Sequence, residues 1–185
     1  MECLAENKTC TVSSAESAFH AVPAEPPRLS MYQQETGKDM PEVLLADDNP
    51  SDVYLIREAL REYSVDCELR VASDGRDAID IIAGRRADVK VENLSLIVLD
   101  LNLPRHDGIE ILRLLHDSPG LMHIPVVVLT SSDSPRDRLT ANQLGAVRYL
   151  RKPSNLNEFL QLGAVFRDLL GQTSTKSRAT GVSNE

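Results

Sequence analysis

The chain has 185 residues, a formal net charge of −8 at pH 7 and a hydrophobic content of 42%, with 4% aromatic residues and no Trp. This length predicts one domain with tails, and the acidic balance argues against nucleic acid as the main partner, because phosphate binding requires clustered Lys and Arg. No stretch approaches the ~18 apolar residues of a membrane span, and the cysteines lack metal-like spacing and suit a reducing compartment, so we expect a cytoplasmic protein without membrane contact.

The two ends of the chain differ from its middle. Residues 1–40 carry scattered charges and a Pro-rich patch without sustained periodicity, and residues 171–185 are small and polar. Such segments cannot bury enough apolar surface to offset the entropy lost on ordering. We therefore expect a disordered N-terminal extension over 1–40, a folded domain over 41–170 and a disordered C-terminal tail over 171–185.

Five short segments predict strands, three of them apolar runs, and a segment with helical periodicity follows each of the five. The predicted strands span 43–46, 67–72, 94–99, 126–129 and 147–150. The predicted helices span 51–63, 75–82 with Asp74 as the cap, 108–116, 135–144 and 156–170. Asn49 and Pro50 favour the first helix start, as a cap and a first-turn residue. The alternation predicts an α/β fold, a doubly wound five-stranded parallel sheet with five helices on both faces.

Polar side chains follow four of the five predicted strands, and all should meet at one edge of the sheet, where such folds bind ligands. They are Asp47 and Asp48 after the first strand, Asp100 after the third, Thr130 after the fourth and Lys152 after the fifth. Three neighbouring carboxylates repel one another unless a cation is present, and Mg²⁺ prefers a few carboxylates together with water. The pattern predicts that the Asp100 carboxylate attacks phosphorus, while Thr130 and Lys152 contact the phosphoryl oxygens.

The motifs at these positions resemble those of the response-regulator receiver family, the phosphoacceptors of two-component signalling. They are LLADDN, VLDLNLPRHDG, VVVLTSSD and YLRKP, and the resemblance covers about residues 42–170. It implies the flavodoxin-like strand order 2-1-3-4-5, with Asp100 as the phosphoacceptor and Thr130 and Lys152 as contacts of the phosphoryl group. It also implies a Mg²⁺ site made by Asp47, Asp48, Asp100 and the backbone carbonyl of Asn102.

The same resemblance implies which residues form a conformational switch and which set the lifetime of the phosphorylated state. Tyr149 matches the switch aromatic of the family and would turn inward when Thr130 moves toward the phosphate. Asn102 and Ser132 lie two residues beyond the phosphoacceptor and the threonine, and would gate the water that hydrolyses the aspartyl phosphate. A bulky side chain in place of Ser132 should therefore change the lifetime of the phosphorylated state.

The function implied is that of a response regulator whose partner is a sensor histidine kinase. The residues after Leu170 are too few and too polar for a helix-turn-helix, so we expect no output domain and signalling by protein–protein contact. The segment VLLADDNPSDVYLIREAL and the long connection over 84–93 are similar to the phytochrome-associated response regulators. In those proteins the kinase often responds to red light.

A homodimer is a further expectation, because related stand-alone receivers often self-associate. We expect it to use the face made by the fourth helix, the fifth strand and the fifth helix. The last helix carries Phe159 and Phe166, and an exposed Phe at either position would contribute to the contact.

Other functions remain open or are disfavoured by particular residues. The chain could act as a phosphate sink, a phosphorelay intermediate or an unphosphorylated docking module, and we expect no enzymatic activity beyond assisting its own phosphorylation and dephosphorylation. A phosphatase of the haloacid-dehalogenase type would need an acid where Asn102 stands. A flavodoxin-like electron carrier would need more aromatic residues, and neither a P-loop nor a dinucleotide-binding motif occurs.

Overall fold

The structure, a computed structural model, describes residues 40–179, with side chains described over 40–171. The predicted N-terminal extension, Met40 excepted, and residues 180–185 of the predicted tail lie outside the described residues. No helix in the described part is long and apolar enough to cross a membrane.

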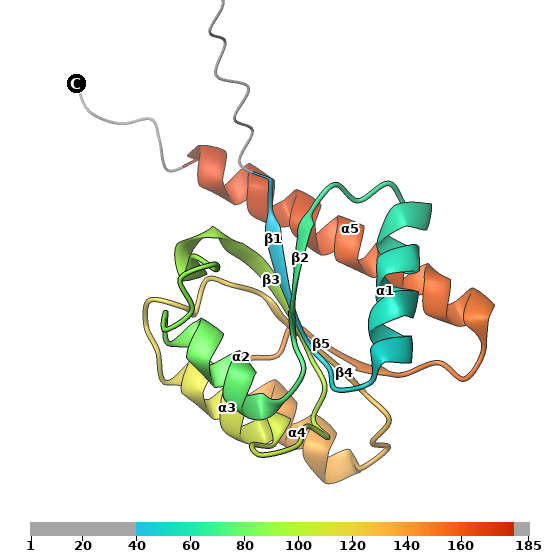
Figure 1. Cartoon of the computed structure of the whole chain (residues 1–185), viewed down its shortest axis with the longest axis horizontal. Coiled ribbons are helices and arrows are strands. Elements are labelled where there is room, and N and C mark those ends of the chain that lie inside the picture. The colour runs from blue at the N-terminus through green and yellow to red at the C-terminus, as the bar shows by residue number, and fades with distance from the viewer. Residues whose placement is uncertain (1–39, 180–185) are drawn as a thin grey trace, which may run out of the picture. The chain divides into compact units, whose positions relative to one another are not determined.

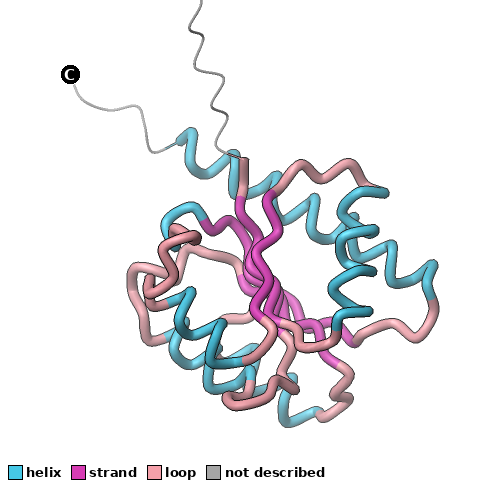
Figure 2. Tube along the Cα trace, in the orientation of Figure 1, coloured by secondary structure: helices cyan, strands magenta, loops and turns pink. Residues whose placement is uncertain are grey.

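Five parallel strands form one sheet in the order β2-β1-β3-β4-β5, which confirms the predicted fold class and strand order. The strands are β1 (Glu42–Ala46), β2 (Glu68–Ala72), β3 (Leu94–Leu99), β4 (Val126–Thr130) and β5 (Arg148–Arg151). They form the magenta centre of Figure 2. The central strands β1, β3 and β4 are buried along almost their whole length, as expected for a parallel sheet covered on both faces.

Helices cover both faces of the sheet. They are α1 (Pro50–Glu62), α2 (Gly75–Ile82), α3 (Gly108–His116), α4 (Pro135–Gln143) and α5 (Leu156–Ala179). Figure 1 shows α1 and α5 on one face and α2, α3 and α4 on the other. A short 3-10 helix, η1 (Val91–Asn93), precedes β3. It was not predicted, because a single turn carries no periodicity.

Short polar side chains begin all five helices. Asn49, Asp74, Asp107 and Ser134 each accept a hydrogen bond from a backbone N–H in the first turn of α1, α2, α3 and α4, respectively. Asn155 does the same for α5, where it accepts from the N–H of Glu158. Such caps satisfy N–H groups that the helix itself leaves unbonded. Because these helices start just after the carboxyl ends of the strands, the caps also fix the loops at that edge of the sheet.

The sheet divides an aliphatic core into two halves. On β1, Val43 and Leu45 pack toward α1 and α5, while Leu44 and Ala46 pack toward α2, α3 and α4. The alternation follows from the period of two residues along a strand. Both halves are built almost entirely from Leu, Ile, Val and Ala, as the low aromatic content requires.

The predicted exposure of Phe159 or Phe166 is wrong. Both side chains are buried, at 3% and 1% exposure, and pack in the core half beneath α5. They lie seven residues apart, which is about two helical turns, so both fall on the inward face of α5. A dimer contact through either ring is therefore excluded in this fold.

The last helix is longer than predicted. Its backbone continues to Ala179 instead of ending at Leu170, so the part of the predicted tail over 171–179 is helical. Once a helix is nucleated, each added residue gains one hydrogen bond, so polar residues can extend it without an apolar face. The predicted division into an extension over 1–40, a domain over 41–170 and a tail from 171 otherwise stays a prediction.

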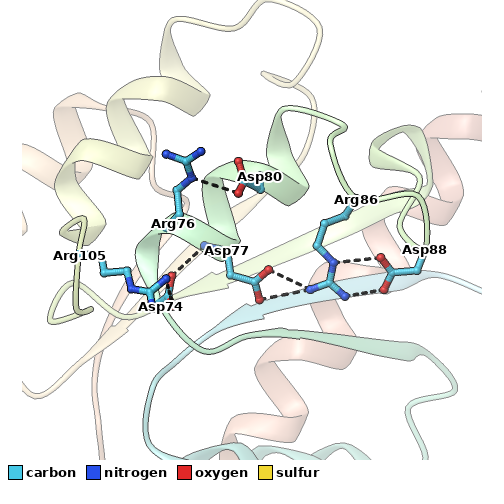
Figure 3. Close-up of polar contacts among 7 residues, drawn as sticks. All are labelled: Asp74, Arg76, Asp77, Asp80, Arg86, Asp88 and Arg105. Carbon is cyan, nitrogen blue, oxygen red and sulfur yellow. Dashed lines mark hydrogen bonds and ion pairs between the residues drawn. The ribbon is translucent and has the colours of Figure 1, made fainter.

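Ion pairs hold the long connection between α2 and β3 against α2 (Figure 3). The Arg86 guanidinium donates to Asp77 of α2 at 2.9 Å and to Asp88 of the connection at 2.9 Å. Val89, next in the chain, is buried in the core. The extra length over 84–93 is therefore packed on the side of α2.

Gly163 lets α5 approach α1 closely, and its replacement should be costly. A Cβ at this position would lie 2.1 Å from the backbone carbonyl oxygen of Ala59 and 2.7 Å from Cδ2 of Tyr63. We expect Gly163→Ala to lower the free energy of unfolding by about 1–3 kcal/mol, because the two helices must move apart.

Gly171 offers a matched control on the same helix. A Cβ there meets no heavy atom within 4 Å. Gly171→Ala should therefore gain up to about 1 kcal/mol from helix propensity alone. Urea unfolding measures the free energy of unfolding of both variants and of the wild-type chain. Equal stabilisation by the two substitutions would contradict the close approach of α5 to α1 at Gly163.

Candidate functional site

The predicted metal and phosphoryl contacts lie at or just beyond the carboxyl ends of the strands, and Thr130 is itself the last residue of β4. The hydrogen bonds of the sheet continue to them, from Asp47 N–H to the Ala72 carbonyl (3.0 Å), from Asp100 N–H to Ala46 (2.9 Å) and from Lys152 N–H to Thr130 (2.8 Å). Their backbones are thus as rigidly placed as the strands themselves. Asp47, Asp100 and Thr130 are buried, at 2%, 4% and 0% exposure.

Three carboxylates come together at this edge. Asp47, Asp48 and Asp100 each offer one oxygen, and these oxygens all lie within 4.8 Å of one another. Burial raises the pKa of Asp47, although a hydrogen bond from Lys152 opposes the shift. A set of carboxylate oxygens with one exposed member, Asp48, suits a hard divalent cation such as Mg²⁺ or Mn²⁺. The side chains therefore fit the predicted metal site, while the carbonyl of Asn102 as a ligand stays a prediction.

Lys152 donates to three carboxylates. Its Nζ lies 2.6 Å from Asp100 Oδ2, 2.8 Å from Asp52 Oδ2 and 2.9 Å from Asp47 Oδ2. Burial alone would lower the pKa of Lys152, but its hydrogen bonds to Asp100, Asp52 and Asp47 raise it above the ordinary value. The ammonium therefore stays charged and neutralises part of the negative charge of the site.

Asp52 is the member of this group that sequence reasoning missed. It lies in the first turn of α1, where an acidic residue is normally explained by the helix dipole. The available signal was its position, since Asp52 lies in the first turn of the helix that begins shortly after the strand end with Asp47 and Asp48.

Asn102 connects two loops of the site. Its backbone N–H donates to Asp100 Oδ1 at 3.0 Å, and its side-chain Nδ2 donates to Thr130 Oγ1 and to Ser131 Oγ, both at 3.3 Å. The Thr130 hydroxyl oxygen also accepts from the backbone N–H of Ser132 at 3.2 Å. The loops after β3 and β4 are thus joined directly beside Asp100.

Tyr149 already lies inward in this structure. Its side chain is buried, its hydroxyl donates to the backbone carbonyl of Ser132 at 3.2 Å, and the Arg138 guanidinium lies 4.6 Å from its ring centre. The Ser132 hydroxyl in turn donates to Asp137 of α4 at 2.6 Å. These contacts connect β5 and α4 with the loop that follows Thr130.

The loop after Asp100 also contacts the start of α2 (Figure 3). Arg105 Nη1 lies 3.2 Å from Asp74 Oδ2, and the backbone N–H of Gly75 donates to the carbonyl of Pro104 at 3.0 Å. Arg105 has a φ of 71°, in the left-handed region that non-glycine residues rarely adopt. Its ion pair with Asp74 offsets part of that backbone cost.

The sequence matches one protein-family model, described as the response regulator receiver domain, over residues 43–163. Among curated proteins it is 35% identical over 120 residues to response regulator Rcp1 of Synechocystis, covering 65% of this chain and 82% of that protein. It is 37% identical over 138 residues to response regulator MprA of Mycolicibacterium vanbaalenii, covering 71% of this chain. The chain spans about half the length of MprA, at 51%.

Solved structures of response regulators are also similar to this chain. The phosphorylated cyanobacterial phytochrome response regulator RcpA matches with a TM-score of 0.66 and 32% identity, over 72% of this chain and 96% of that one. The Mn²⁺-bound form of Rcp1 matches with a TM-score of 0.63 and 33% identity, over 69% of this chain and 92% of that one.

Proposed function

The chain belongs to the response regulator receiver domain family, and from this premise we propose that it is a phosphoaspartyl switch that a sensor histidine kinase phosphorylates on Asp100. The observation that carries the proposal is the setting of the Asp100 carboxylate. It is buried beside two other acids, receives the Asn102 N–H at 3.0 Å on one oxygen and receives the Lys152 ammonium at 2.6 Å on the other. The proposed receiver domain covers residues 41–170.

The proposed reaction is a displacement at phosphorus. One oxygen of the Asp100 carboxylate forms a bond to phosphorus while the bond from phosphorus to the kinase histidine nitrogen breaks, and the electron pair leaves with the imidazole. The Lys152 ammonium and the Thr130 hydroxyl are placed to donate to phosphoryl oxygens. Bound Mg²⁺, held by Asp47, Asp48 and Asp100, would offset the repulsion between the acids and the incoming phosphoryl oxygens.

The switch is proposed to act through Thr130 and Tyr149. A phosphoryl group that draws the Thr130 hydroxyl toward it would change the contacts of Asn102 and Ser132, because both donate to that hydroxyl oxygen. Ser132 carries the carbonyl that Tyr149 binds, so the state of the site would bias the position of Tyr149 and α4. Asn102 and Ser132 are also proposed to set the lifetime of the phosphorylated state.

Signalling is proposed to occur by contact of this receiver with other proteins. The chain matches 82% of Rcp1, so little of that relative lies outside the receiver. The similarity to Rcp1 and RcpA favours a phytochrome-type kinase as the donor, and such a partner together with the cysteine pattern favours the cytoplasm. Acting as a phosphate sink or a relay is the second candidate, because both share the same chemistry at Asp100.

A homodimer through α4, β5 and α5 remains a proposal, without the two buried phenylalanines. Leu139 of α4 and Val147, just before β5, are exposed at 59% and 40% and offer the apolar part of such a contact. Light scattering with and without beryllofluoride tests it, and monomers under both conditions would contradict it.

Phosphotransfer profiling tests the kinase half of the proposal. Each sensor histidine kinase of the source organism is autophosphorylated and mixed with the chain, and transfer is followed at short times. We expect a phytochrome-type kinase to transfer fastest. Transfer from none of the kinases would contradict the assignment.

Asp48 should control metal binding without disturbing the fold. It is the exposed member of the carboxylate group. We expect Mg²⁺ at about 100 times its dissociation constant to stabilise the wild-type chain by about 2.7 kcal/mol and to stabilise Asp48→Asn far less. Thermal unfolding with Mg²⁺ and with EDTA measures the difference. An equal shift in both proteins would remove Asp48 from the metal site.

A further inference from the structure

The three acceptors of the Lys152 ammonium have different positions in the site. Asp47 and Asp100 follow β1 and β3 and belong to the carboxylate group that fits a metal ion, whereas Asp52 lies in the first turn of α1. In the described part of the chain, Asp52 is not a member of that carboxylate group. Its contact with the ammonium is nevertheless as short as the others, at 2.8 Å.

The donors of Lys152 are fully used in this arrangement. An ammonium has three N–H groups and no acceptor, and three carboxylates surround the Nζ at 2.6–2.9 Å. The side chain is only 11% exposed, so water offers little replacement for a lost partner. A phosphoryl oxygen that approaches Asp100 can therefore receive a hydrogen bond from Lys152 only when one carboxylate gives up its own.

We propose that Asp52 is a positioning residue that restrains Lys152 in the unphosphorylated chain and thereby slows phosphoryl transfer to Asp100. The inference rests on the proposed function. As the Asp100 oxygen bonds to phosphorus and the leaving group departs with its electron pair, the ammonium must turn toward a phosphoryl oxygen. Asp52 opposes this turn by a charge-assisted hydrogen bond. It also adds a fourth negative charge to a site that an anionic phosphodonor must enter.

Asp52→Asn tests the restraint on phosphorylation. The amide retains the shape of the side chain but removes the charge, so we expect phosphorylation by acetyl phosphate at saturating Mg²⁺ to accelerate by about threefold to tenfold. Asp52→Ser, which shortens the side chain, should act in the same direction and serves as a second variant. A rate that is unchanged or lower in both variants would overturn the inference.

Glu62→Gln is the matched control. Glu62 is an exposed acid at the far end of α1, so the substitution changes the net charge equally on the same helix. The two positions are about 15 Å apart along the helix axis, beyond the Debye length of about 8 Å at physiological ionic strength. Acceleration by Glu62→Gln to the same extent would show that net charge, and not the contact with Lys152, sets the rate.

A second readout follows the ammonium itself. Reductive methylation of the unphosphorylated chain, quantified by mass spectrometry, compares Lys152 with the exposed Lys90. We expect Asp52→Asn to raise the ratio of Lys152 to Lys90 modification by about threefold or more, because the neutral amide oxygen holds the ammonium less strongly than the carboxylate does. An unchanged ratio would overturn the inference. If acetyl phosphate labels the wild-type chain and Asp52→Asn is labelled no faster, the result contradicts only the role of Asp52. If the wild-type chain takes up no phosphoryl group, the result contradicts the proposed function as well.

Discussion

Asp100→Asn is expected to abolish labelling of the chain by acetyl phosphate in the presence of Mg²⁺. A neutral amide is a poor nucleophile and cannot form an acyl phosphate, so no slower version of the same reaction remains. The exchange is nearly isosteric, and Lys152 keeps its contacts with Asp47 and Asp52. We therefore expect the variant to fold normally while losing the modification.

The control for this substitution is Asp133→Asn. Asp133 is an exposed acid in the loop after β4 that pairs with Arg151. It carries the same charge change close to the site and should leave the stoichiometry of labelling at the wild-type level. Labelling of Asp100→Asn at the wild-type stoichiometry would show that another side chain accepts the phosphoryl group.

Lys152→Met is expected to destabilise the fold by about 3–5 kcal/mol near neutral pH when Mg²⁺ is absent, because it leaves buried carboxylates without their cation. Asp47 and Asp100 are 2% and 4% exposed, so solvent cannot replace the ammonium. Urea unfolding measures the loss, and the exposed Lys90→Met is the control. Added Mg²⁺ should restore part of the stability, since it supplies positive charge to the same acids.

The pH dependence of this loss has a definite sign. Burial raises the pKa of Asp47, and the hydrogen bond from Lys152 opposes the shift. Without Lys152, the pKa of Asp47 in the folded chain should rise further, while in the unfolded chain it keeps its ordinary value of about 3.9. The folded chain then binds more protons than the unfolded chain, so stability falls as the pH rises through the window between the two pKa values.

The loss caused by Lys152→Met should therefore be larger at about pH 7.5 than at about pH 4.5. The ammonium of wild-type Lys152 stays charged across this range, because its pKa is raised. A loss that is independent of pH would indicate that packing of the lysine side chain, and not its charge, stabilises the site.

Sequence patterns predicted the sheet better than the ends of the helices. The run over 94–99 coincides with β3, because its residues are apolar except for Ser95 and because polar residues flank it on both sides. The end of α5 was misplaced, because hydrogen bonding alone extends a helix past its last apolar residue. Periodicity identified α5 as amphipathic, and Phe159 and Phe166 both lie on its apolar face. The expectation that one of these rings would be exposed did not follow that pattern, and both are buried.

The sequence predicted those site residues that lie at the ends of strands. Asp47, Asp48 and Asp100 could be placed together because parallel strands end at one edge. Asp52 could not, because its contact with Lys152 depends on the direction in which α1 leaves β1, and this is a property of tertiary packing. The inward position of Tyr149 likewise depends on its hydrogen bond to Ser132, which no local pattern indicates.

The most direct test of the account locates the phosphoryl group chemically. The chain is phosphorylated with acetyl phosphate and Mg²⁺, reduced with borohydride, which converts an aspartyl phosphate to homoserine, and analysed by peptide mass spectrometry. We expect homoserine at position 100 and at no other aspartate. Homoserine at a different position, or its absence under conditions that label a known receiver, would contradict the assignment of Asp100 as the phosphoacceptor.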